Sequence, residues 1–366
     1  MLYKKFVRPL LFLKDPEKTH EQTLALLSRL SFLKGSLEQL FVVRDSRLQV
    51  SVGPLTFANP VGLAAGFDKN ATAIKTWPGF GFGFIEIGAI TAHPQPGNPS
   101  PRLFRLPKDQ ALINRLGFNN EGAEAIGAKL ESLQKKRVLP KIPLGINIGR
   151  SKVVETKDAA ADYLFTFERL YPFGDYFTLN ISSPNTPNLR ELQEKSLLKD
   201  LLEVIQEKNR ELAGRLRAKE KPILVKIAPD MEFSQVDDII EVVQSQKVAG
   251  IIATNATAFL RENLATRIDE PGGLSGKPLR ARATSFIRYI YKATQGRLPI
   301  IGSGGIFTAE HAYEKIAAGA TAVQIYTGFV YEGPAAVKRI NLGLLKLMEQ
   351  EGFKNLSEVV GSGAGA

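Results

Sequence analysis

The chain has 366 residues, of which 44% are hydrophobic and 23% charged, and its formal net charge is +11. This length fits two ordinary domains or one large β/α barrel, and the composition excludes wholesale disorder. The positive charge favours anionic partners of any kind, whereas the absence of cysteine excludes disulfides, thiolate nucleophiles and cysteine-bound metals. No apolar run approaches the roughly 18 residues of a membrane-spanning helix. The run after Lys4-Lys5 is also too short for a secretory signal, so we expect an intracellular protein without a metal site.

Residues 1–45 have the pattern of short amphipathic helices. Apolar residues recur at helical spacing over residues 3–13 and 24–30, and Asp15-Pro16-Glu17 supplies a cap, a proline at the first helical position and an early acid. We therefore expect two helices. They either pack as a cap on the main domain or lie on a membrane surface, where their excess of positive charge favours anionic lipid.

After residue 46 the pattern changes to short apolar runs that alternate with helical stretches. Residues 47–52 and 55–57 flank Gly53-Pro54 as a hairpin. Eight runs of strand length follow, at residues 61–65, 84–89, 144–148, 176–181, 223–227, 250–253, 299–302 and 322–326. Helical periodicity separates several of them, at residues 121–134, 197–216, 233–246 and 309–318. This order predicts a (β/α)₈ TIM barrel over residues 46–358, with an open doubly wound sheet as the alternative. The glycine and alanine content of residues 359–366 predicts a flexible tail.

Asparagine recurs where the predicted strands end, although it is a poor strand former. Asn70, Asn147, Asn180 and Asn255 end or follow the first, third, fourth and sixth strands. Because the chemistry of β/α barrels takes place at the carboxyl ends of the strands, these amides would meet at one mouth. One such residue alone is more typical of a turn or cap, but four together favour a site for a planar heterocycle with several carbonyl and NH groups.

Lys226 lies inside the predicted fifth strand, on the same face as Leu224 and Ala228. An unpaired ammonium inside a barrel is strongly unfavourable, so we expect this lysine to contact an anion or an electron-rich ligand. The alternative is a lysine whose head group reaches solvent at the end of the strand.

Glycine-rich loops follow the last two strands. Gly302-Ser303-Gly304-Gly305 precedes a helix start at Thr308, and Tyr326-Thr327-Gly328 follows the eighth strand. Loops in these two positions form the phosphate site that many β/α barrels share. We therefore expect a phosphate-bearing ligand at this end of the mouth.

With these residues in view, the chain resembles the membrane-associated, quinone-reducing class of the dihydroorotate dehydrogenase family. The resemblance extends from about Leu2 to Glu332. It rests on Asp15-Pro16-Glu17-Lys18-Thr19-His20, Ala65-Gly66-Phe67-Asp68-Lys69, Glu86-Ile87-Gly88, Pro101-Arg102-Leu103-Phe104-Arg105, Asn114-Arg115-Leu116-Gly117-Phe118-Asn119, Asn180-Ile181-Ser182-Ser183-Pro184-Asn185-Thr186, Val225-Lys226-Ile227-Ala228-Pro229-Asp230, Gly272-Gly273-Leu274-Ser275-Gly276 and Ile301-Gly302-Ser303-Gly304-Gly305. It implies a barrel that holds flavin mononucleotide (FMN) and oxidises dihydroorotate to orotate in pyrimidine synthesis, with a membrane quinone as electron acceptor.

The resemblance also implies roles for individual residues. FMN would be held by Ala65, Gly66, Ala89, Asn147, Asn180, Lys226, Thr254, Gly276, Gly304, Gly305, Tyr326 and Thr327. Dihydroorotate would be bound by Lys69, Asn114, Arg115, Leu116, Gly117, Phe118, Asn180, Asn185 and Asn255. Lys69 would supply the positive charge opposite the substrate anion. The quinone tunnel would be lined by His20, Arg102 and Tyr326.

Ser183 would be the general base that removes the C5 proton of dihydroorotate while a hydride leaves C6. Soluble classes of the family place cysteine there, and this chain has none. Because a serine hydroxyl is a weak base, Ser183 would act within a hydrogen-bond relay through Thr186 and water. Ala89 and Ala256 stand where many relatives carry hydroxyl residues. One flavin contact and one substrate contact would therefore be lost or replaced by water.

The N-terminal helices would form the opening through which a quinone reaches the flavin, at the cytoplasmic face of a bacterial cell membrane. We expect a monomer whose partners are dihydroorotate, a quinone and anionic lipid. Nucleic acid binding is disfavoured because aromatic residues are not interleaved with the basic ones. Two alternatives remain from the residues alone: a flavin-free lyase that uses Lys226 as a Schiff base, and a membrane-binding module whose barrel is only a scaffold.

Overall fold

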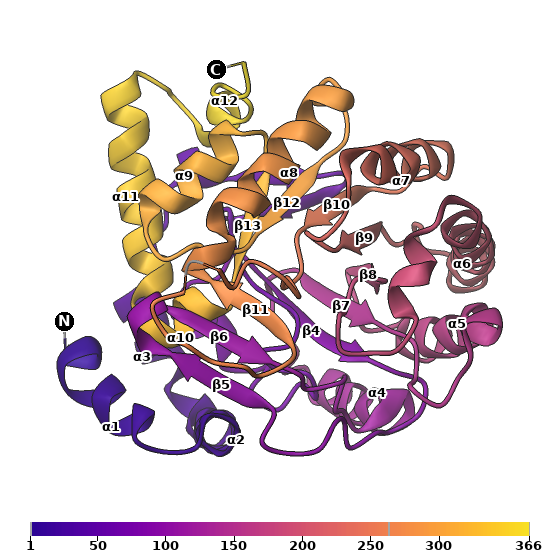
Figure 1. Ribbon diagram of the computed structural model, residues 1–366, viewed down its shortest axis with the longest axis horizontal. Helices are drawn as coiled ribbons and strands as arrows, with labels where there is room; N and C mark the ends of the chain where they lie inside the picture. Colours follow the sequence, from indigo (N-terminus) through magenta and orange to yellow (C-terminus); the bar gives the residue numbers. More distant parts are fainter. Residues whose placement is uncertain (1, 263, 366) are drawn as a thin grey trace.

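The computed structural model describes residues 2–262 and 264–365. Eight parallel strands close into a barrel, and helices surround it (Figure 1). The barrel strands are β3 (Val61–Leu63), β4 (Phe84–Ile90), β7 (Leu144–Ile148), β8 (Tyr176–Asn180), β9 (Ile223–Ile227), β10 (Gly250–Ala253), β12 (Ile300–Ser303) and β13 (Ala322–Ile325). Around the barrel they follow one another in chain order, and β13 pairs with β3. The predicted (β/α)₈ barrel is confirmed, and each predicted run matches a strand to within two residues at either end.

The outer helices are amphipathic and turn their apolar sides to the strands. They are α4 (Gly122–Lys135), α5 (Ala159–Leu170), α6 (Lys195–Leu216), α7 (Phe233–Ser245), α8 (Arg280–Ala293), α9 (Ala309–Ala317) and α11 (Ala336–Glu351), together with the short α10 (Thr327–Glu332) and α12 (Leu356–Val359). On α7, for example, Val236, Ile239 and Val243 are buried. This helix begins with a capping box, in which the side chains of Glu232 and Gln235 satisfy amide groups of the first turn.

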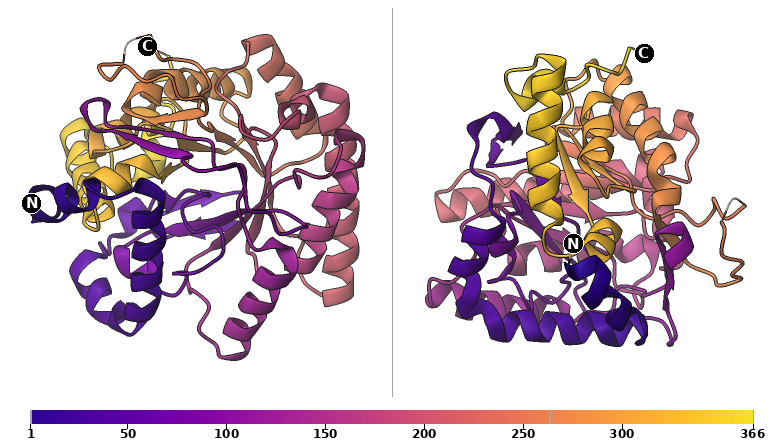
Figure 2. Two further views of the ribbon diagram at one scale, coloured as in Figure 1. Left: turned by 60° about the horizontal axis from the view of Figure 1, so that its bottom comes forward. Right: turned by 90° about the vertical axis from the view of Figure 1, so that its left-hand side faces the viewer.

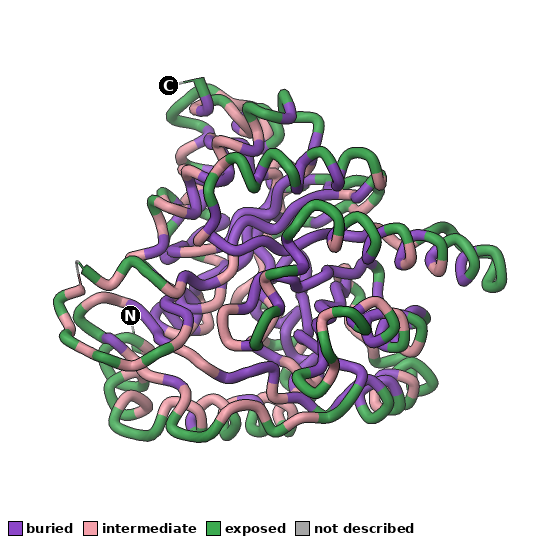
Figure 3. The backbone as a smooth tube through the Cα atoms, turned by 45° about the vertical axis from the view of Figure 1, so that its right-hand side comes forward, coloured by how far each residue is buried: buried purple, intermediate pink, exposed green. Residues whose placement is uncertain are grey.

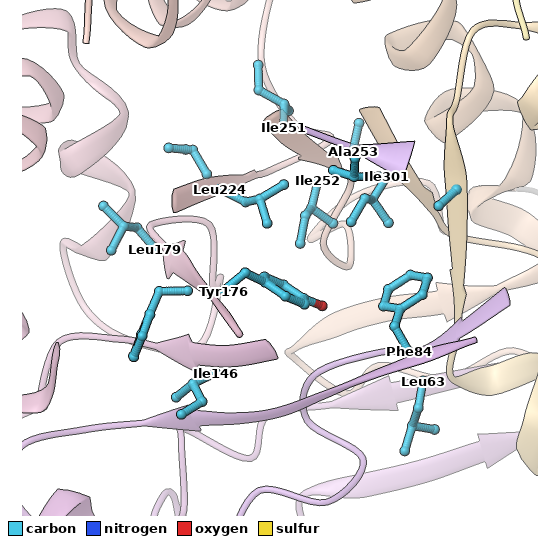
Figure 4. Packing of buried hydrophobic residues seen from close by; sticks show 14 of the residues in the cluster. Leu63, Phe84, Ile146, Tyr176, Leu179, Leu224, Ile251, Ile252, Ala253 and Ile301 are labelled. Carbon is cyan, nitrogen blue, oxygen red and sulfur yellow. The ribbon is translucent and has the colours of Figure 1, made fainter. Parts of the chain in front are cut away.

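The barrel interior is packed with large side chains rather than open. Figure 3 shows that the barrel strands are buried, while the outer sides of the helices are exposed. Phe84 stacks on Phe57, with 4.1 Å between the ring centroids, and Figure 4 shows Phe84 and Tyr176 extending into the enclosed space. A Cβ at Gly62 would lie 2.3 Å from the Phe84 ring, so glycine is required there. Phe57 belongs to the predicted hairpin, β1 (Val50–Val52) and β2 (Leu55–Phe57), which is confirmed.

The N-terminal segment completes the wall of the barrel. It consists of a π-helical turn (Tyr3–Val7), α1 (Arg8–Phe12), α2 (Pro16–Arg29), a 3₁₀ turn (Leu30–Leu33) and α3 (Lys34–Phe41). The link between β3 and β4 is fully described and holds a 3₁₀ turn (Trp77–Phe80) but no α-helix. The N-terminal helices pack there instead: Thr76 Oγ1 donates to Leu27 O at 2.8 Å, and the rings of Phe41 and Phe80 lie 5.8 Å apart. The segment runs along one side of the barrel (Figure 2).

A second, antiparallel sheet lies over the carboxyl ends of the barrel strands. Its strands are β5 (Leu103–Leu106), β6 (Ala111–Asn114) and β11 (Gly273–Gly276), in the order β11-β6-β5. The first two strands belong to the connection between β4 and α4, and the third belongs to the connection between β10 and α8. The sequence patterns did not predict this sheet, which places Asn114 and Gly276 above the barrel.

Residues 361–364 pack against α9, in place of the flexible tail that the composition of residues 359–366 predicts. Gly361 N donates to Ile316 O at 3.1 Å and Gly363 N donates to Ala317 O at 2.9 Å. The last carbonyl groups of a helix lack partners within the helix. The tail supplies a partner to Ala317 O and a second one to Ile316 O, which also accepts from Gly319 N. Ala364 is buried as a result.

We predict that Phe84→Ala destabilises the protein by about 3–5 kcal/mol, because it leaves a cavity beneath the barrel mouth. Phe165→Ala serves as the control, since Phe165 lies on α5 with 46% of its surface exposed. Urea denaturation measures both free energies of unfolding. Equal losses in the two variants would contradict the packed interior described above.

Candidate active site

A deep cavity opens at the carboxyl ends of the barrel strands, beneath the second sheet. It encloses about 1050 Å³, including space that is open to solvent. Most of the predicted site residues line it. They are the predicted base Ser183; Lys69, Asn114, Leu116, Gly117, Phe118, Asn180, Asn185 and Asn255 from the predicted substrate set; and Ala65, Gly66, Ala89, Asn180, Lys226, Thr254, Gly276, Gly304, Gly305, Tyr326 and Thr327 from the predicted cofactor set. The structure therefore gathers residues that are up to 262 positions apart in the sequence, Ala65 and Thr327 being the extremes.

Three predicted residues do not line the cavity. Asn70, which we expected at the mouth with the other asparagines, instead accepts a hydrogen bond at its Oδ1 from Glu121 N at 3.0 Å. The Arg115 side chain points away from it and donates to Glu270 Oε2 at 2.6 Å and to Pro101 O at 2.7 Å. Its guanidinium also lies over the Phe104 ring. The side chain therefore connects the segment around Glu270 with residues 101–104. Asn147 is fully buried below the cavity, where its Oδ1 accepts a hydrogen bond from Asn180 Nδ2 at 3.0 Å.

Sequence reasoning missed three polar residues that line the cavity: Ser275, Ser303 and Gln324. Gln324 lies within an apolar strand run, as Lys226 does, and this was a signal that could have identified it. Ser303 belongs to the glycine-rich loop after β12. Ser275 lies in the segment Gly272–Gly276, one of those that carry the family resemblance, and this was the signal that could have identified it.

Hydrogen bonds join the asparagines of the cavity to one another. Asn185 Nδ2 lies 3.1 Å from Asn114 O and 3.3 Å from Asn114 Oδ1. Asn255 Nδ2 lies 2.9 Å from Ser182 Oγ and 3.4 Å from Asn180 Oδ1. These amides come from four separate loops or strands, and together they form a neutral polar wall with donors and acceptors fixed in place.

Lys69 provides a positive charge in this wall. Burial lowers the pKa of its ammonium to about 8, and Glu17 opposes this effect while Arg102 adds to it. The neighbouring Asp68 is turned away and accepts hydrogen bonds from Thr72 N, Ala73 N and Trp77 Nε1. Within the described chain Lys69 forms no ion pair, so its charge is available to an anion in the cavity.

Ser183 lies on the cavity wall just after β8, with 5% of its surface exposed. Its Oγ accepts a hydrogen bond from Asn185 N at 3.2 Å. Thr186 is buried nearby in the same loop, but the described residues include no hydrogen bond between its hydroxyl and Ser183. A relay through Thr186 alone is therefore not formed in this structure.

Glycines line the part of the cavity near α10 in backbone conformations that other residues rarely adopt. The φ angles are +98° at Gly276, +115° at Gly304 and +72° at Gly305. A Cβ at Gly276 would lie 2.3 Å from Gln110 O, and one at Gly305 would lie 2.6 Å from Arg280 Cβ. Bare backbone amides can therefore approach a ligand here, as a phosphate group requires.

Lys226 reaches the cavity from β9 and is 5% exposed. Burial lowers the pKa of its ammonium, and the negative charge of Glu86 opposes the effect. The described residues offer its Nζ no hydrogen-bond partner, so this donor is free for a ligand. Lys226 therefore faces the cavity, and the alternative of a solvent-exposed head group is wrong. Its contact with a ligand stays a prediction.

A second cavity of about 620 Å³ lies between the N-terminal helices and the first cavity. It is lined by His20 and by Lys69, Leu103, Leu116 and Tyr326, and the last four also line the first cavity. Burial lowers the pKa of His20 to about 4, so the ring is neutral at pH 7. Its Nε2 lies 2.7 Å from Phe67 O and must carry the proton, because a carbonyl oxygen only accepts.

Arg102 does not line this second cavity, because it forms a two-point ion pair with Glu17 of α2. Its Nε lies 3.0 Å from both carboxylate oxygens, and its Nη2 lies 2.7 Å from Oε1. The pair ties the N-terminal segment to the residues just before β5. Glu17 itself lines the second cavity.

Known proteins share this architecture and sequence. A family model described as dihydroorotate dehydrogenase matches residues 47–348. A dihydroorotate dehydrogenase (quinone) from Gloeobacter violaceus is 49% identical over 359 residues, which cover 98% of this chain and 98% of that protein. A protein of the same name from Acaryochloris marina is 51% identical over 381 residues, covering 98% and 99%. A ligand-free type DHODH structure from Eimeria tenella is 38% identical, with a TM-score of 0.87 over 95% of this chain and 99% of that chain.

We predict that affinity for orotate, the anion that the sequence resemblance implies, is constant from pH 6 to about 8 and falls above it. The pKa of Lys69 is about 8, so the ammonium that pairs with the anion is lost as the pH rises further, by at most about tenfold per pH unit. Calorimetric titration measures this. Lys69→Met should bind weakly at every pH, and a wild-type affinity that stays constant to pH 9.5 would show that the anion lies elsewhere.

Proposed function

This chain belongs to the dihydroorotate dehydrogenase family, and from that premise we propose how its cavity binds the reactants. It is an oxidoreductase that converts dihydroorotate to orotate in pyrimidine biosynthesis, with a quinone as electron acceptor. The observation that carries the proposal is the convergence of Lys69, Ser183, the asparagine amides and the glycine cradle in one cavity. The Schiff-base lyase and the scaffold-only alternatives have no support from this family membership.

The family is flavin-dependent, and we propose that this chain binds FMN. The residues present fit such a group: Gly276, Gly304 and Gly305 offer bare backbone to the phosphate, and the Lys226 ammonium lacks a protein partner. Ala65, Gly66, Ala89, Asn180, Thr254, Tyr326 and Thr327 would surround the rest of the flavin. When bound, FMN supplies a two-electron acceptor for the hydride that leaves C6 of dihydroorotate. Asn147 would act on this site from below, through Asn180, rather than by direct contact.

The substrate lies opposite Lys69 in this proposal. Its carboxylate pairs with the Lys69 ammonium, while the amides of Asn114, Asn185 and Asn255 bond the ring carbonyl and NH groups. Leu116, Gly117 and Phe118 form the adjoining wall, and Asn180 lies below. Arg115 contributes by holding the loop of Glu270 over the mouth, since its side chain is outside the cavity. Binding by several fixed groups holds C5 of the substrate next to Ser183.

Ser183 is the proposed general base for the C5 proton. Asn185 N donates to Ser183 Oγ, and this bond fixes the oxygen while leaving its own proton free to be donated onward. No hydrogen bond joins the Thr186 hydroxyl to Ser183 among the described residues, so we propose that water completes the relay. Removal of one hydroxyl group should therefore slow proton abstraction and leave the binding groups in place.

The second cavity is the proposed path for the quinone. It connects the first cavity, through shared walls at Lys69 and Tyr326, to the N-terminal helices. His20 lines this path as a neutral ring whose one N–H is donated to Phe67 O, and Glu17, the ion-pair partner of Arg102, lines it as well. Because the second cavity leads to the helices rather than to the solvent-facing mouth, a quinone could reach the flavin while dihydroorotate is bound.

The outer face of the N-terminal segment supports binding to a membrane surface. Leu2, Phe6, Leu10 and Leu13 are 75%, 63%, 66% and 84% exposed, and their spacing places them on one side of the segment. Exposed Lys5 and Lys14 lie beside them. No helix in the described residues combines the length and apolar composition needed to cross a membrane. We propose that residues 1–45 form a membrane-associated segment of a monomer. Its apolar stripe would enter an anionic membrane at the cytoplasmic face.

We predict that Ser183→Ala keeps bound flavin and orotate affinity, but that anaerobic flavin reduction by dihydroorotate slows by about 10²–10⁴-fold. Stopped-flow absorbance measures the rate. Ser151→Ala removes a buried hydroxyl outside the cavity and should reduce flavin at the wild-type rate. Near-normal reduction in Ser183→Ala would assign the base to another group.

We also predict that Leu10→Asp combined with Leu13→Asp abolishes binding to anionic vesicles and lowers turnover with a long-tailed quinone. Each buried leucine contributes about 1.5–3 kcal/mol, and the added charges repel the lipid. Flavin reduction by dihydroorotate should be unchanged. Vesicle sedimentation measures binding, with Leu342→Asp on α11, 49% exposed, as the control. Full vesicle binding by the double variant would contradict the proposed membrane surface.

A further inference from the structure

Glu86 is a carboxylate enclosed inside the barrel, below the cavity, with none of its surface exposed. Four side chains donate to it. Asn147 Nδ2 lies 2.8 Å from Oε1, while Gln324 Nε2, Thr178 Oγ1 and Tyr176 OH lie 3.0, 3.1 and 3.2 Å from Oε2. These donors come from three different strands, β7, β13 and β8, and β8 supplies two of them. No role in the reaction proposed above uses this carboxylate.

The hydrogen bonds from Glu86 towards the substrate run in one direction. An ionised carboxylate can only accept, so Asn147 must turn its NH₂ group to Glu86. The Oδ1 of Asn147 then faces Asn180 and accepts from Asn180 Nδ2 at 3.0 Å. This leaves Asn180 Oδ1 to accept from Ser182 Oγ at 3.0 Å and from Asn255 Nδ2 at 3.4 Å. Each amide in the series is therefore oriented by the one before it.

We infer that Glu86 is a positioning residue, whose acceptor-only carboxylate fixes the amide orientation of Asn147 and Asn180 and hence the hydrogen-bonding groups that Asn180 and Asn255 present to the substrate. The inference rests on the proposed function, because it takes the cavity to be the dihydroorotate site. A residue at this position whose only role was to fill space would not need a carboxylate. Only a group that cannot donate forces the series to run one way.

The surroundings of Glu86 keep it in this acceptor role. Burial and the nearby Glu86 charge raise the pKa of Tyr176 well above 10, so its hydroxyl remains a donor. Lys226 supplies the opposite charge, and its backbone pairs with Asn180 across β8 and β9. Removal of the carboxylate charge would therefore act on the substrate amides and on the ammonium that faces the cavity.

The test uses Glu86→Gln in the flavin-loaded protein, with orotate affinity measured by calorimetry. Glutamine has the same shape but can donate as well as accept, so the amides can reverse. We expect orotate affinity to fall by about tenfold or more, the effect of one mismatched buried hydrogen bond. Tyr176→Phe is the matched control, because it removes one donor to the same carboxylate but leaves the acceptor. Its affinity should change by less than about threefold.

A second variant tests the direction itself. Combining Glu86→Gln with Asn147→Asp moves the acceptor-only group by one place, so that Asn180 again turns its Nδ2 towards position 147. This double variant should recover most of the orotate affinity that Glu86→Gln loses. Two independent substitutions would instead add their losses, so affinity above that of Glu86→Gln would show that the two positions are coupled. A structural role for Glu86 alone predicts no recovery.

Three results would overturn the inference: wild-type affinity in Glu86→Gln, an equal loss in Tyr176→Phe, or no recovery in the double variant. Failure of both Glu86 variants to fold would also overturn it, since Glu86 would then serve barrel stability alone. Wild-type protein that binds neither flavin nor orotate would contradict the proposed function. Wild-type binding with an unchanged Glu86→Gln affinity contradicts only the role of Glu86.

Discussion

Closure of the parallel barrel is the constraint on which the site depends, because it brings the carboxyl end of every strand to one rim. Below that rim the interior is filled by side chains such as Phe84, so the cavity has a solid floor. Within the floor lies the carboxylate of Glu86, whose hydrogen bonds extend upward to Asn180. Fold and chemistry therefore share one set of contacts: the strands that form the core also orient the groups that face the substrate.

Local pattern predicted the barrel and most of the rim, because apolar strand runs and the polar residues that end them are close in sequence. Lys226 and Gly304-Gly305 could be placed in this way. The second sheet could not, since Asn114 pairs with Gly273 across more than 150 positions, and its strands are short and only partly apolar. Side-chain direction was also beyond local pattern. Arg115 and Asn147 are close in sequence to residues that line the cavity. Tertiary contacts turn the Arg115 side chain outward, however, and place the Asn147 side chain below the cavity.

The N-terminal segment has two different faces, and this explains why the sequence allowed two interpretations. Its inner face completes the barrel wall at Thr76 and Phe80, as a structural cap would. Its outer face leaves Phe6, Leu10 and Leu13 in contact with water. The second cavity lies between these helices and the first cavity. Under the proposed function, a segment that is both barrel wall and membrane contact would bring a lipid-soluble acceptor to the cavity without opening the substrate mouth.

The visible spectrum of the purified protein under anaerobic conditions tests the central claim most directly. The account predicts a yellow protein whose flavin absorbance is bleached by dihydroorotate and restored by a subsequent addition of quinone. Both half-reactions would then be assigned to this cavity. A colourless protein, or a flavin spectrum that dihydroorotate leaves unchanged, would contradict the account.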